Sequence, residues 1–293
     1  MEANERSKTL MNLKIRTPVL DDYRLQLDAV NDHLCYGAFY AFEASQNILQ
    51  KASKQPDEFT TQLFPSNPYS ERIHRPVTDI INFEEKYLNQ SAAIALQTGM
   101  EVVQCYFKKV RKFAANFHNI ESANTSEPED ELLLTQMTLM KCEFQKEMFD
   151  TIVYLRRRRN HCVHMLQNPT SEMEKFWKND AELLNQFWKI QRTNLLDFDF
   201  SNEELTAFRI QDGFAIMNLL RVCMSVIDSN IAINFSIQDI IADATKRVLL
   251  DSNHLRGDQE RCIRKVKGLV MRDYGKRLET AEHYRMIVDE MVL

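Results

Sequence analysis

The sequence predicts an all-α protein, a helix bundle of six to eight helices. The 293 residues include only six glycines and seven prolines, which leaves few residues for the tight turns that connect strands. All seven prolines lie at or before Pro169, so the C-terminal part contains none. Apolar residues recur at intervals of three and four along most of the chain, the spacing that places them on one face of a helix.

The N-terminal part predicts an irregular segment over residues 1–20, followed by two long helices. The first covers residues 21–54, because its apolar side chains recur at helical spacing. That apolar face comprises Leu25, Leu27, Val30, Leu34, Ala38, Phe39 and Phe42. Residues 55–76 hold four prolines and predict a long loop. The second helix is expected over residues 76–118, with an interruption near residues 89–91.

A polar segment divides the chain into two predicted regions. Residues 119–130 are polar with one proline, which is typical of a linker. The helical region before it is 1–118, either a separate domain or part of the same bundle, and the core region is 131–293. The core opens with a single long helix, expected over residues 131–166. Its apolar face comprises Leu133, Met137, Met140, Phe144, Met148, Ile152 and Leu155.

Further helices are expected after this one. Ser171 and Glu174 have the spacing of a capping box and predict the start of the next helix. Another long helix is expected over residues 203–230, and residues 234–250 either continue it or follow a kink. Residues 258–291 predict a final helix or helix pair.

The charge balance excludes a protein that coats nucleic acid by bulk electrostatics. The chain has 37 basic and 42 acidic residues, a formal charge of −5, whereas such proteins are basic. Any contact with nucleic acid must therefore come from local basic patches. The six cysteines are scattered without a CxxC pair, a pattern typical of free thiols in a reducing compartment rather than of a zinc site.

No targeting or membrane-spanning segment is expected. The first ten residues are polar, unlike a signal peptide, and no apolar stretch approaches the roughly 18 residues that would span a bilayer. The longest apolar stretches, such as residues 213–220, have the length of a core helix. We therefore expect a cytoplasmic protein without a membrane partner.

One short motif points to chemistry. Residues 156–164 read RRRRNHCVH, so two histidines follow within five residues of the last of four consecutive arginines, near the end of a predicted helix. Arg159 and His164 stand five positions apart, a spacing that often arises by chance. Asn160 follows the arginine directly, which makes a chance match roughly an order of magnitude rarer.

These residue types suit RNA cleavage by the RNA's own 2′-hydroxyl. The reaction needs a group that moves a proton near neutral pH and cationic donors aimed at the phosphorane. We expect His164 to act as general base or acid, and Arg159 to stabilise charge in the transition state. Asn160 would orient the histidine or donate to a phosphate oxygen, and His161 and Arg158 are candidates for support. The reaction requires no metal and no other cofactor.

The hexapeptide 159–164 resembles the Arg-Asn-x-x-x-His signature of the HEPN superfamily of helical ribonucleases and nucleotide-binding proteins. The resemblance covers this motif and the all-helical setting. It implies a HEPN-like core, endoribonuclease activity on an RNA substrate, and products with a 2′,3′-cyclic phosphate and a 5′-hydroxyl. It also implies a homodimer in which two motifs face each other across one cleft. HEPN relatives are often toxins or antiviral defence effectors, which implies an antitoxin or another inhibitory partner protein.

Helix geometry sets a further condition on the motif. Five residues of an ideal helix turn about 500°, so Arg159 and His164 project about 140° apart. Both can approach one phosphate only if the helix distorts towards Pro169 or if a second copy completes the site. The HEPN resemblance implies the second copy.

Other basic segments are candidates to bind RNA. Residues 108–112 read KKVRK, and residues 261–277 carry seven basic residues against one aspartate on an amphipathic pattern. The alternative for both segments is a solvated helix face. The candidate RNA-binding residues are Arg156, Arg157, Lys108, Lys109, Arg261, Arg264 and Lys265.

Several other interpretations of the motif are open. The arginines could only complement the dipole at a helix C-terminus. His161 and His164 could ligate a metal with Cys162, although zinc needs further ligands and the chain has no HExxH or ExxH partner. The main functional alternative is a non-catalytic interaction or regulatory protein that binds an acidic partner or nucleotide through its Arg cluster. A further one is a HEPN protein whose motif is itself a target for modification.

Overall fold

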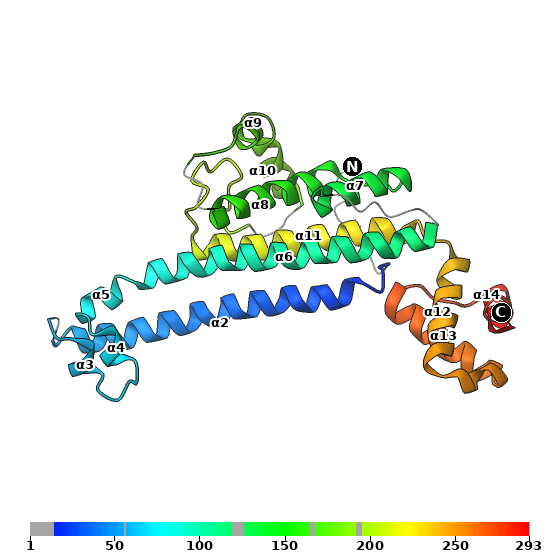
Figure 1. The fold of residues 1–293 in the computed structure, drawn as a ribbon, viewed down its shortest axis with the longest axis horizontal. Helices are drawn as coiled ribbons and strands as arrows, with labels where there is room; N and C mark the ends of the chain where they lie inside the picture. Colours follow the sequence, from blue (N-terminus) through cyan, green and yellow to red (C-terminus); the bar gives the residue numbers. More distant parts are fainter. Residues whose placement is uncertain (1–14, 56, 119–125, 165–167, 192–194, 293) are drawn as a thin grey trace. The chain divides into compact units, whose positions relative to one another are not determined.

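The computed structural model describes residues 15–55, 57–118, 126–164, 168–191 and 195–292. Over these ranges the chain is helical, as Figure 1 shows, and holds no strand beyond an isolated bridge between Phe59 and Pro76. The predicted all-α class is therefore confirmed.

Within the described ranges, ten helices have nine or more residues, so the expected number of six to eight is too low. They are α2 (Leu20–Ala52), α6 (Glu84–His118), α7 (Glu129–Leu139), α8 (Lys146–His164), α9 (Ser171–Asn179), α10 (Ala181–Ile190), α11 (Ile210–Ile233), α12 (Ile237–Asp251), α13 (Gln259–Tyr274) and α14 (Ala281–Val292). The short helices are α3 (Thr60–Leu63), α4 (Ser70–Ile73), α5 (Val77–Ile81) and the 3-10 helix η1 (Asn253–Gly257).

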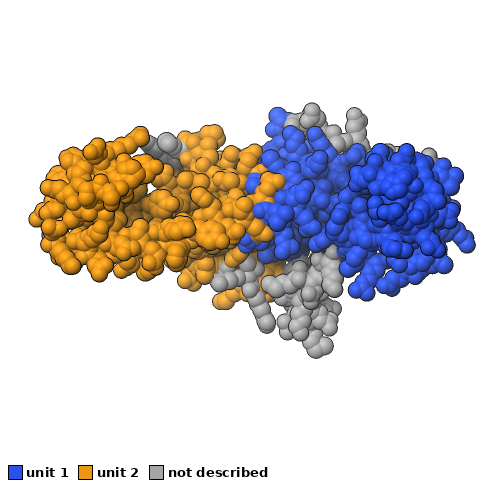
Figure 2. All heavy atoms as spheres, turned by 90° about the horizontal axis from the view of Figure 1, so that it is seen from below, with its two compact units in different colours: residues 1–25, 102–153, 221–293 blue, residues 26–101, 154–220 orange. Residues whose placement is uncertain are grey.

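The chain divides into two compact units, coloured separately in Figure 2. Unit 1 comprises the ranges 1–25, 102–153 and 221–293, and unit 2 comprises 26–101 and 154–220. Helices α2, α6, α8 and α11 each contribute residues to both units. Of the segment 119–130, for which we predict a linker, residues 119–125 lie outside the described residues, and α7 begins at Glu129.

The helix expected over residues 131–166 is in fact two helices, α7 and α8. Lys141 has a φ of 56°, and its N–H donates to the carbonyl of Thr138 at 3.1 Å. The N–H of Cys142 donates to the carbonyl of Met137 at 2.9 Å. These two bonds form a Schellman motif, which ends a helix at a left-handed residue that is usually glycine. Because lysine stands there, no glycine or proline marks the end in the sequence.

Other helix boundaries also differ from expectation. Helix α6 is continuous, so the interruption near residues 89–91 is absent. Thr170 rather than Ser171 is the N-cap of α9, and its hydroxyl accepts the N–H of Met173 at 3.4 Å. Helix α11 begins at Ile210 and not near residue 203.

The C-terminal segments form separate helices. Ser236 caps α12, where its hydroxyl accepts the N–H of Asp239 at 3.1 Å, so residues 234–250 do not simply continue α11. Residues 258–291 form the helix pair α13 and α14, one of the two expected arrangements. Asp258 caps α13, because its carboxylate accepts the N–H of Arg261 at 3.1 Å.

In unit 2, helices α2, α6 and α11 approach closely at Gly213. A Cβ atom at this position would lie 2.9 Å from Leu34 of α2 and 3.0 Å from Ala92 of α6. Both neighbours are buried, and the Cα atom of Ala92 would be 3.2 Å away, so backbone itself blocks a side chain here. Glycine therefore lets the three helices meet.

Only part of the predicted apolar face of α2 is buried. Leu27 and Leu34 are 0% and 2% exposed, whereas Leu25, Phe39 and Phe42 are 69%, 60% and 54% exposed. Leu27 and Leu34 are seven residues apart, so α2 packs along a single narrow line. The face inferred from the spacing of apolar residues was too wide.

In unit 1, a buried carboxylate fixes the segment that precedes α2. Asp228 of α11 is fully buried and accepts the backbone N–H and the hydroxyl of Thr17 at 2.7 and 2.6 Å. The hydroxyl of Tyr106 on α6 donates to the same carboxylate at 2.8 Å. Burial raises the pKa of Asp228 to about 7, although the hydrogen bonds from Thr17 and Tyr106 act in the opposite direction.

Helix α11 is long and apolar enough to cross a membrane. This differs from the expectation that no apolar stretch approaches the length of a membrane span. Its most apolar window is 67% buried within the protein, as the core helix of a folded domain would be. Among the described residues, no other helix meets these criteria of length and composition.

Candidate active site on helix α8

The motif occupies the last turns of α8, which remains α-helical as far as His164. The helix therefore keeps its regular geometry between Arg159 and His164, and the two residues project about 140° apart. Asn160 and Val163 lie between them around the helix axis. Arg159 and Asn160 are half-buried, and Val163 and His164 are exposed. These four residues form an exposed strip on α8.

Arg158 lies on the buried side of α8, so it does not face a substrate. Arg158 is only 1% exposed. The guanidinium donates to the carbonyls of Leu205 and Ala207 at 3.3 and 2.9 Å, and its carbon lies 4.2 Å from the ring centroid of Phe208. Tyr154, one turn earlier, accepts a further bond at 3.4 Å. Arg158 thus holds the loop before α11 against α8.

His161 is also on the buried side. It is 2% exposed, and its Nε2 has no hydrogen-bond partner in the part of the chain that the structure describes. Burial lowers the pKa of His161, because the charged imidazolium would lose its hydration. His161 is therefore neutral near pH 7 and offers no group to a substrate in this structure. Next to it, the thiol of Cys162 points to the carbonyl of Leu205 at 3.8 Å, and burial raises its pKa.

Arg159 is held by two polar neighbours on the exposed side. One guanidinium nitrogen lies 3.6 Å from the carboxylate of Glu101 on α6, and another donates to the side chain of Asn160 at 3.2 Å. The side chains of Arg159 and Glu101 are 31% and 65% exposed, so the pair is well hydrated. Exposed pairs of this kind contribute about 0–1 kcal/mol, so an incoming phosphate can displace the carboxylate at little cost.

The neighbouring arginines lie at the rim of the strip. Arg156 and Arg157 are both half-buried, and Arg157 donates to the carbonyl of Glu172 on α9 at 3.3 Å. Guanidinium groups are donors of the kind that contact phosphate.

The other candidate RNA-binding residues belong to unit 1, whereas the motif belongs to unit 2. Lys108 and Lys109 are exposed on α6, and Arg261 and Arg264 are exposed on α13. Lys265 is exposed as well, and it donates to the hydroxyl of Ser252 at 3.1 Å. These side chains are accessible to a solvent-borne polyanion.

The structure adds one site residue that the sequence did not indicate. Glu101 lies on another helix, far from the motif in the chain, and no motif or spacing links it to Arg159. No group of three or more His, Cys, Asp or Glu side chains that could hold a metal ion occurs among the described residues.

Within one copy, the arrangement thus offers a hydrated guanidinium and, about 140° around the helix axis, an exposed imidazole. Comparison of the chain with known proteins gives no relative: no family model, no curated protein and no solved structure matches it.

Proposed function

We propose that the protein is a metal-independent endoribonuclease that acts as a homodimer through Arg159, Asn160 and His164. The observation that supports this function best is that neighbouring side chains of α8 lie in different environments. Arg158 supplies the cation that packing requires, whereas Arg159, Asn160 and His164 share the exposed strip.

The proposed reaction is an in-line transfer within the RNA. The 2′-oxygen attacks the adjacent phosphorus as one histidine removes the hydroxyl proton, and the bond from phosphorus to the 5′-oxygen breaks as that oxygen takes up a proton. The products are a 2′,3′-cyclic phosphate and a 5′-hydroxyl. The guanidinium of Arg159 stabilises the charge on the phosphorane oxygens, and the amide of Asn160 donates to one of them.

A second copy completes the site in this proposal. Because α8 is regular up to His164, the chain does not bring Arg159 and His164 together by distortion within that helix. Two exposed strips that face each other would place the arginine of one copy opposite the histidine of the other. A two-fold axis produces such an arrangement from one interface.

The biological setting of the proposed enzyme follows from the HEPN resemblance alone. We propose a cytoplasmic toxin or antiviral effector that is held inactive by an antitoxin or another inhibitory partner. An uncontrolled ribonuclease would damage the RNA of its own cell, so control is part of the proposal.

The test compares single variants on a labelled single-stranded RNA in the presence of a chelator. Arg159→Ala and His164→Ala should each lower the cleavage rate by about 100-fold or more, the scale of a lost acid–base group. His254→Ala is the matched control, since His254 is exposed on η1 outside the motif, and it should cleave as the wild type does. Equal cleavage by wild type and His164→Ala would contradict the proposal. RNA binding without cleavage by the folded wild type would favour the non-catalytic alternative instead.

A further inference from the structure

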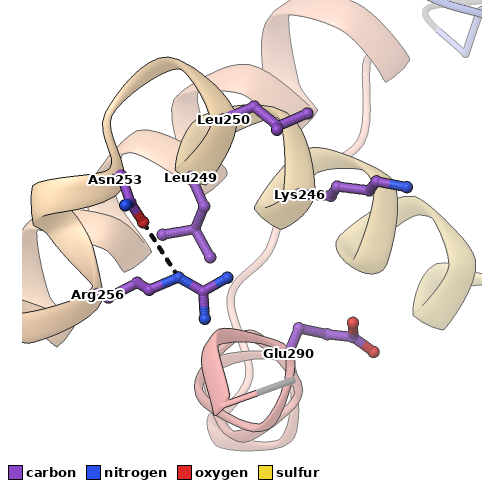
Figure 3. A pocket seen from close by; sticks show the side chains of 6 residues that line it. All are labelled: Lys246, Leu249, Leu250, Asn253, Arg256 and Glu290. Atoms are coloured by element: carbon purple, nitrogen blue, oxygen red, sulfur yellow. Dashed lines mark hydrogen bonds between the residues drawn. The ribbon is translucent and has the colours of Figure 1, made fainter.

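A pocket in unit 1 lies between α12, η1 and α14, as Figure 3 shows. Its volume is about 520 Å³, within the range of about 300–1,000 Å³ that is typical of clefts for small molecules. The side chains that line it are Lys246, Leu249, Leu250, Asn253, Arg256 and Glu290. None of them belongs to the motif on α8 or to the candidate RNA-binding residues.

Arg256 is fixed in this pocket by uncharged acceptors. Its Nε donates to the side-chain oxygen of Asn253 at 3.2 Å, and one terminal nitrogen donates to the carbonyl of Met291 at 3.2 Å. In Figure 3 the guanidinium lies between Leu249 of α12 and Glu290 of α14. Both acceptors are neutral, and among the described residues Arg256 has no ion pair, so the guanidinium is oriented without a paired carboxylate. Its other terminal nitrogen has donors left for a ligand.

Two further charged side chains line the pocket without a partner. Within the described residues, neither the ammonium of Lys246 nor the carboxylate of Glu290 has a hydrogen bond or an ion pair. Lys246 adds a second positive charge, and Glu290 adds an acceptor of N–H and O–H groups. In Figure 3 the side chain of Lys246 extends away from Arg256, so the pocket offers one oriented cation, a second on a flexible side chain, and one carboxylate for donor groups.

An apolar wall lies beside these charges. Leu249 is 6% exposed, whereas Leu250 is 75% exposed, the second highest value among the large exposed apolar side chains. Covering such a leucine with the apolar face of a ligand removes apolar surface from water, which stabilises the complex.

We propose that this pocket binds a nucleoside monophosphate. The phosphate binds to the guanidinium of Arg256, and the flexible side chain of Lys246 turns towards it to supply the second cation. The base packs on the two leucines, and a ribose or base donor bonds to Glu290. A nucleotide combines the three features that the lining requires: an anionic head, a flat apolar face and hydrogen-bond donors. The inference is independent of the proposed ribonuclease activity, and either can fail without the other.

Calorimetric titration of the full chain at about 0.15 M salt tests the ligand class. The probes are adenosine monophosphate, adenosine, inorganic phosphate and phenylalanine. Adenosine monophosphate supplies all three features, adenosine lacks the anion, and inorganic phosphate supplies the anion alone. Phenylalanine supplies the arrangement of charges of an amino acid. Adenosine monophosphate should bind about tenfold more tightly than each of the others, because only it uses every part of the lining. If phenylalanine binds more tightly, or if phosphate alone binds as well, the proposal is wrong.

Three variants locate the binding site. Lys246→Met should weaken binding of adenosine monophosphate about tenfold, the effect of one lost charge-assisted bond. Leu250→Ser should weaken adenosine monophosphate but not inorganic phosphate, a selectivity that general destabilisation would not produce. Arg285→Gln is the matched control: Arg285 is exposed on α14 outside the pocket, and its loss also removes one positive charge.

Arg256 is left intact in these variants because it also bonds to the carbonyl of Met291. An unchanged affinity in Lys246→Met, or an equal loss of affinity in Arg285→Gln, would overturn the assignment of this pocket.

Discussion

The four consecutive arginines at 156–159 occupy different environments on one helix. Arg158 points inward and donates to two loop carbonyls, whereas Arg159 points outward to a hydrated carboxylate. One turn of α8 therefore carries a structural cation next to a candidate catalytic one. The two roles predict opposite responses to mutation.

Arg158→Met should destabilise the protein by about 2–3 kcal/mol, because two buried carbonyls lose a charged donor. Arg157→Met is the matched control, since its half-buried side chain makes one bond to Glu172, and its loss should cost under about 1 kcal/mol. Urea denaturation followed by circular dichroism measures both changes. Equal midpoints for Arg158→Met and wild type would show that Arg158 does not hold the loop.

Glu101→Gln tests the hydrated partner of Arg159. The amide keeps the size of the side chain but removes the negative charge that competes with phosphate, so RNA affinity should rise about two- to fivefold. The effect should shrink as salt is raised, because exposed charges are screened. Fluorescence anisotropy with a labelled RNA at low and high salt gives the comparison. A lower affinity in Glu101→Gln at low salt would exclude competition between Glu101 and phosphate.

At the scale of the elements, the existence of helices could be predicted and their ends could not. Regular apolar spacing indicated the stretches that became α2, α6, α8 and α11. The end of α7 was missed because a lysine, Lys141, takes the left-handed position that glycine usually marks. Helix ends depend on hydrogen bonds that the spacing of apolar residues does not encode.

Lys141→Gly should therefore stabilise the protein by about 0.5 kcal/mol. A residue with a side chain costs about 1–2 kcal/mol in the left-handed conformation, and glycine avoids this cost. Part of the gain is lost, because glycine raises the backbone entropy of the unfolded state. Lys141→Ala is the control for the loss of the side chain and should not stabilise. Thermal unfolding distinguishes the two, and a lower melting temperature for Lys141→Gly than for Lys141→Ala would contradict the Schellman assignment.

The inner and outer faces of the motif could not be derived from the sequence either. Leu155 belongs to the apolar face of the predicted helix, and both Arg158 and Arg159 follow it at helical spacing, three and four positions later. The carbonyls of residues 205 and 207 decide which arginine turns inward, and that loop is remote in the chain. The sequence therefore placed the motif residues near the end of a helix, as the structure does. Which of them face inward depends on tertiary contacts.

At the scale of the whole molecule, Asp228 makes stability depend on pH. The pKa of this carboxyl is about 7 in the folded protein and near 4 when the chain unfolds, so the folded state holds the proton more tightly. Stability from this group is therefore full below about pH 4 and falls as pH rises to 7. His161 acts in the opposite direction in part of the same window, because burial lowers its pKa.

Comparison with Asp228→Asn isolates the contribution of the carboxyl, since His161 is common to both proteins. The wild type should lose more stability than Asp228→Asn between pH 5.0 and about pH 7.5, because asparagine has no proton to lose. Urea midpoints at the two pH values provide the measurement. Parallel changes in both proteins would show that Asp228 does not titrate in this range.

The division into two units was also beyond the reach of sequence patterns. Each unit combines segments from distant parts of the chain, and α2, α6, α8 and α11 contribute to both. The bond from Thr17 to Asp228 joins residues 211 positions apart, and neither residue carries a motif. Polar composition indicates where a chain leaves a helix, but it does not indicate which segments pack together.

The central claim, that two copies build one ribonuclease site, is tested most directly by mixing inactive variants. Arg159→Ala and His164→Ala are co-expressed with different tags, and the heterodimer is purified and assayed on RNA beside each homodimer. The heterodimer retains one intact pair, an arginine from one copy and a histidine from the other. It should therefore cleave at about half the wild-type rate, while both homodimers stay inactive. An inactive heterodimer, or a wild-type monomer that cleaves RNA, would contradict the two-copy site.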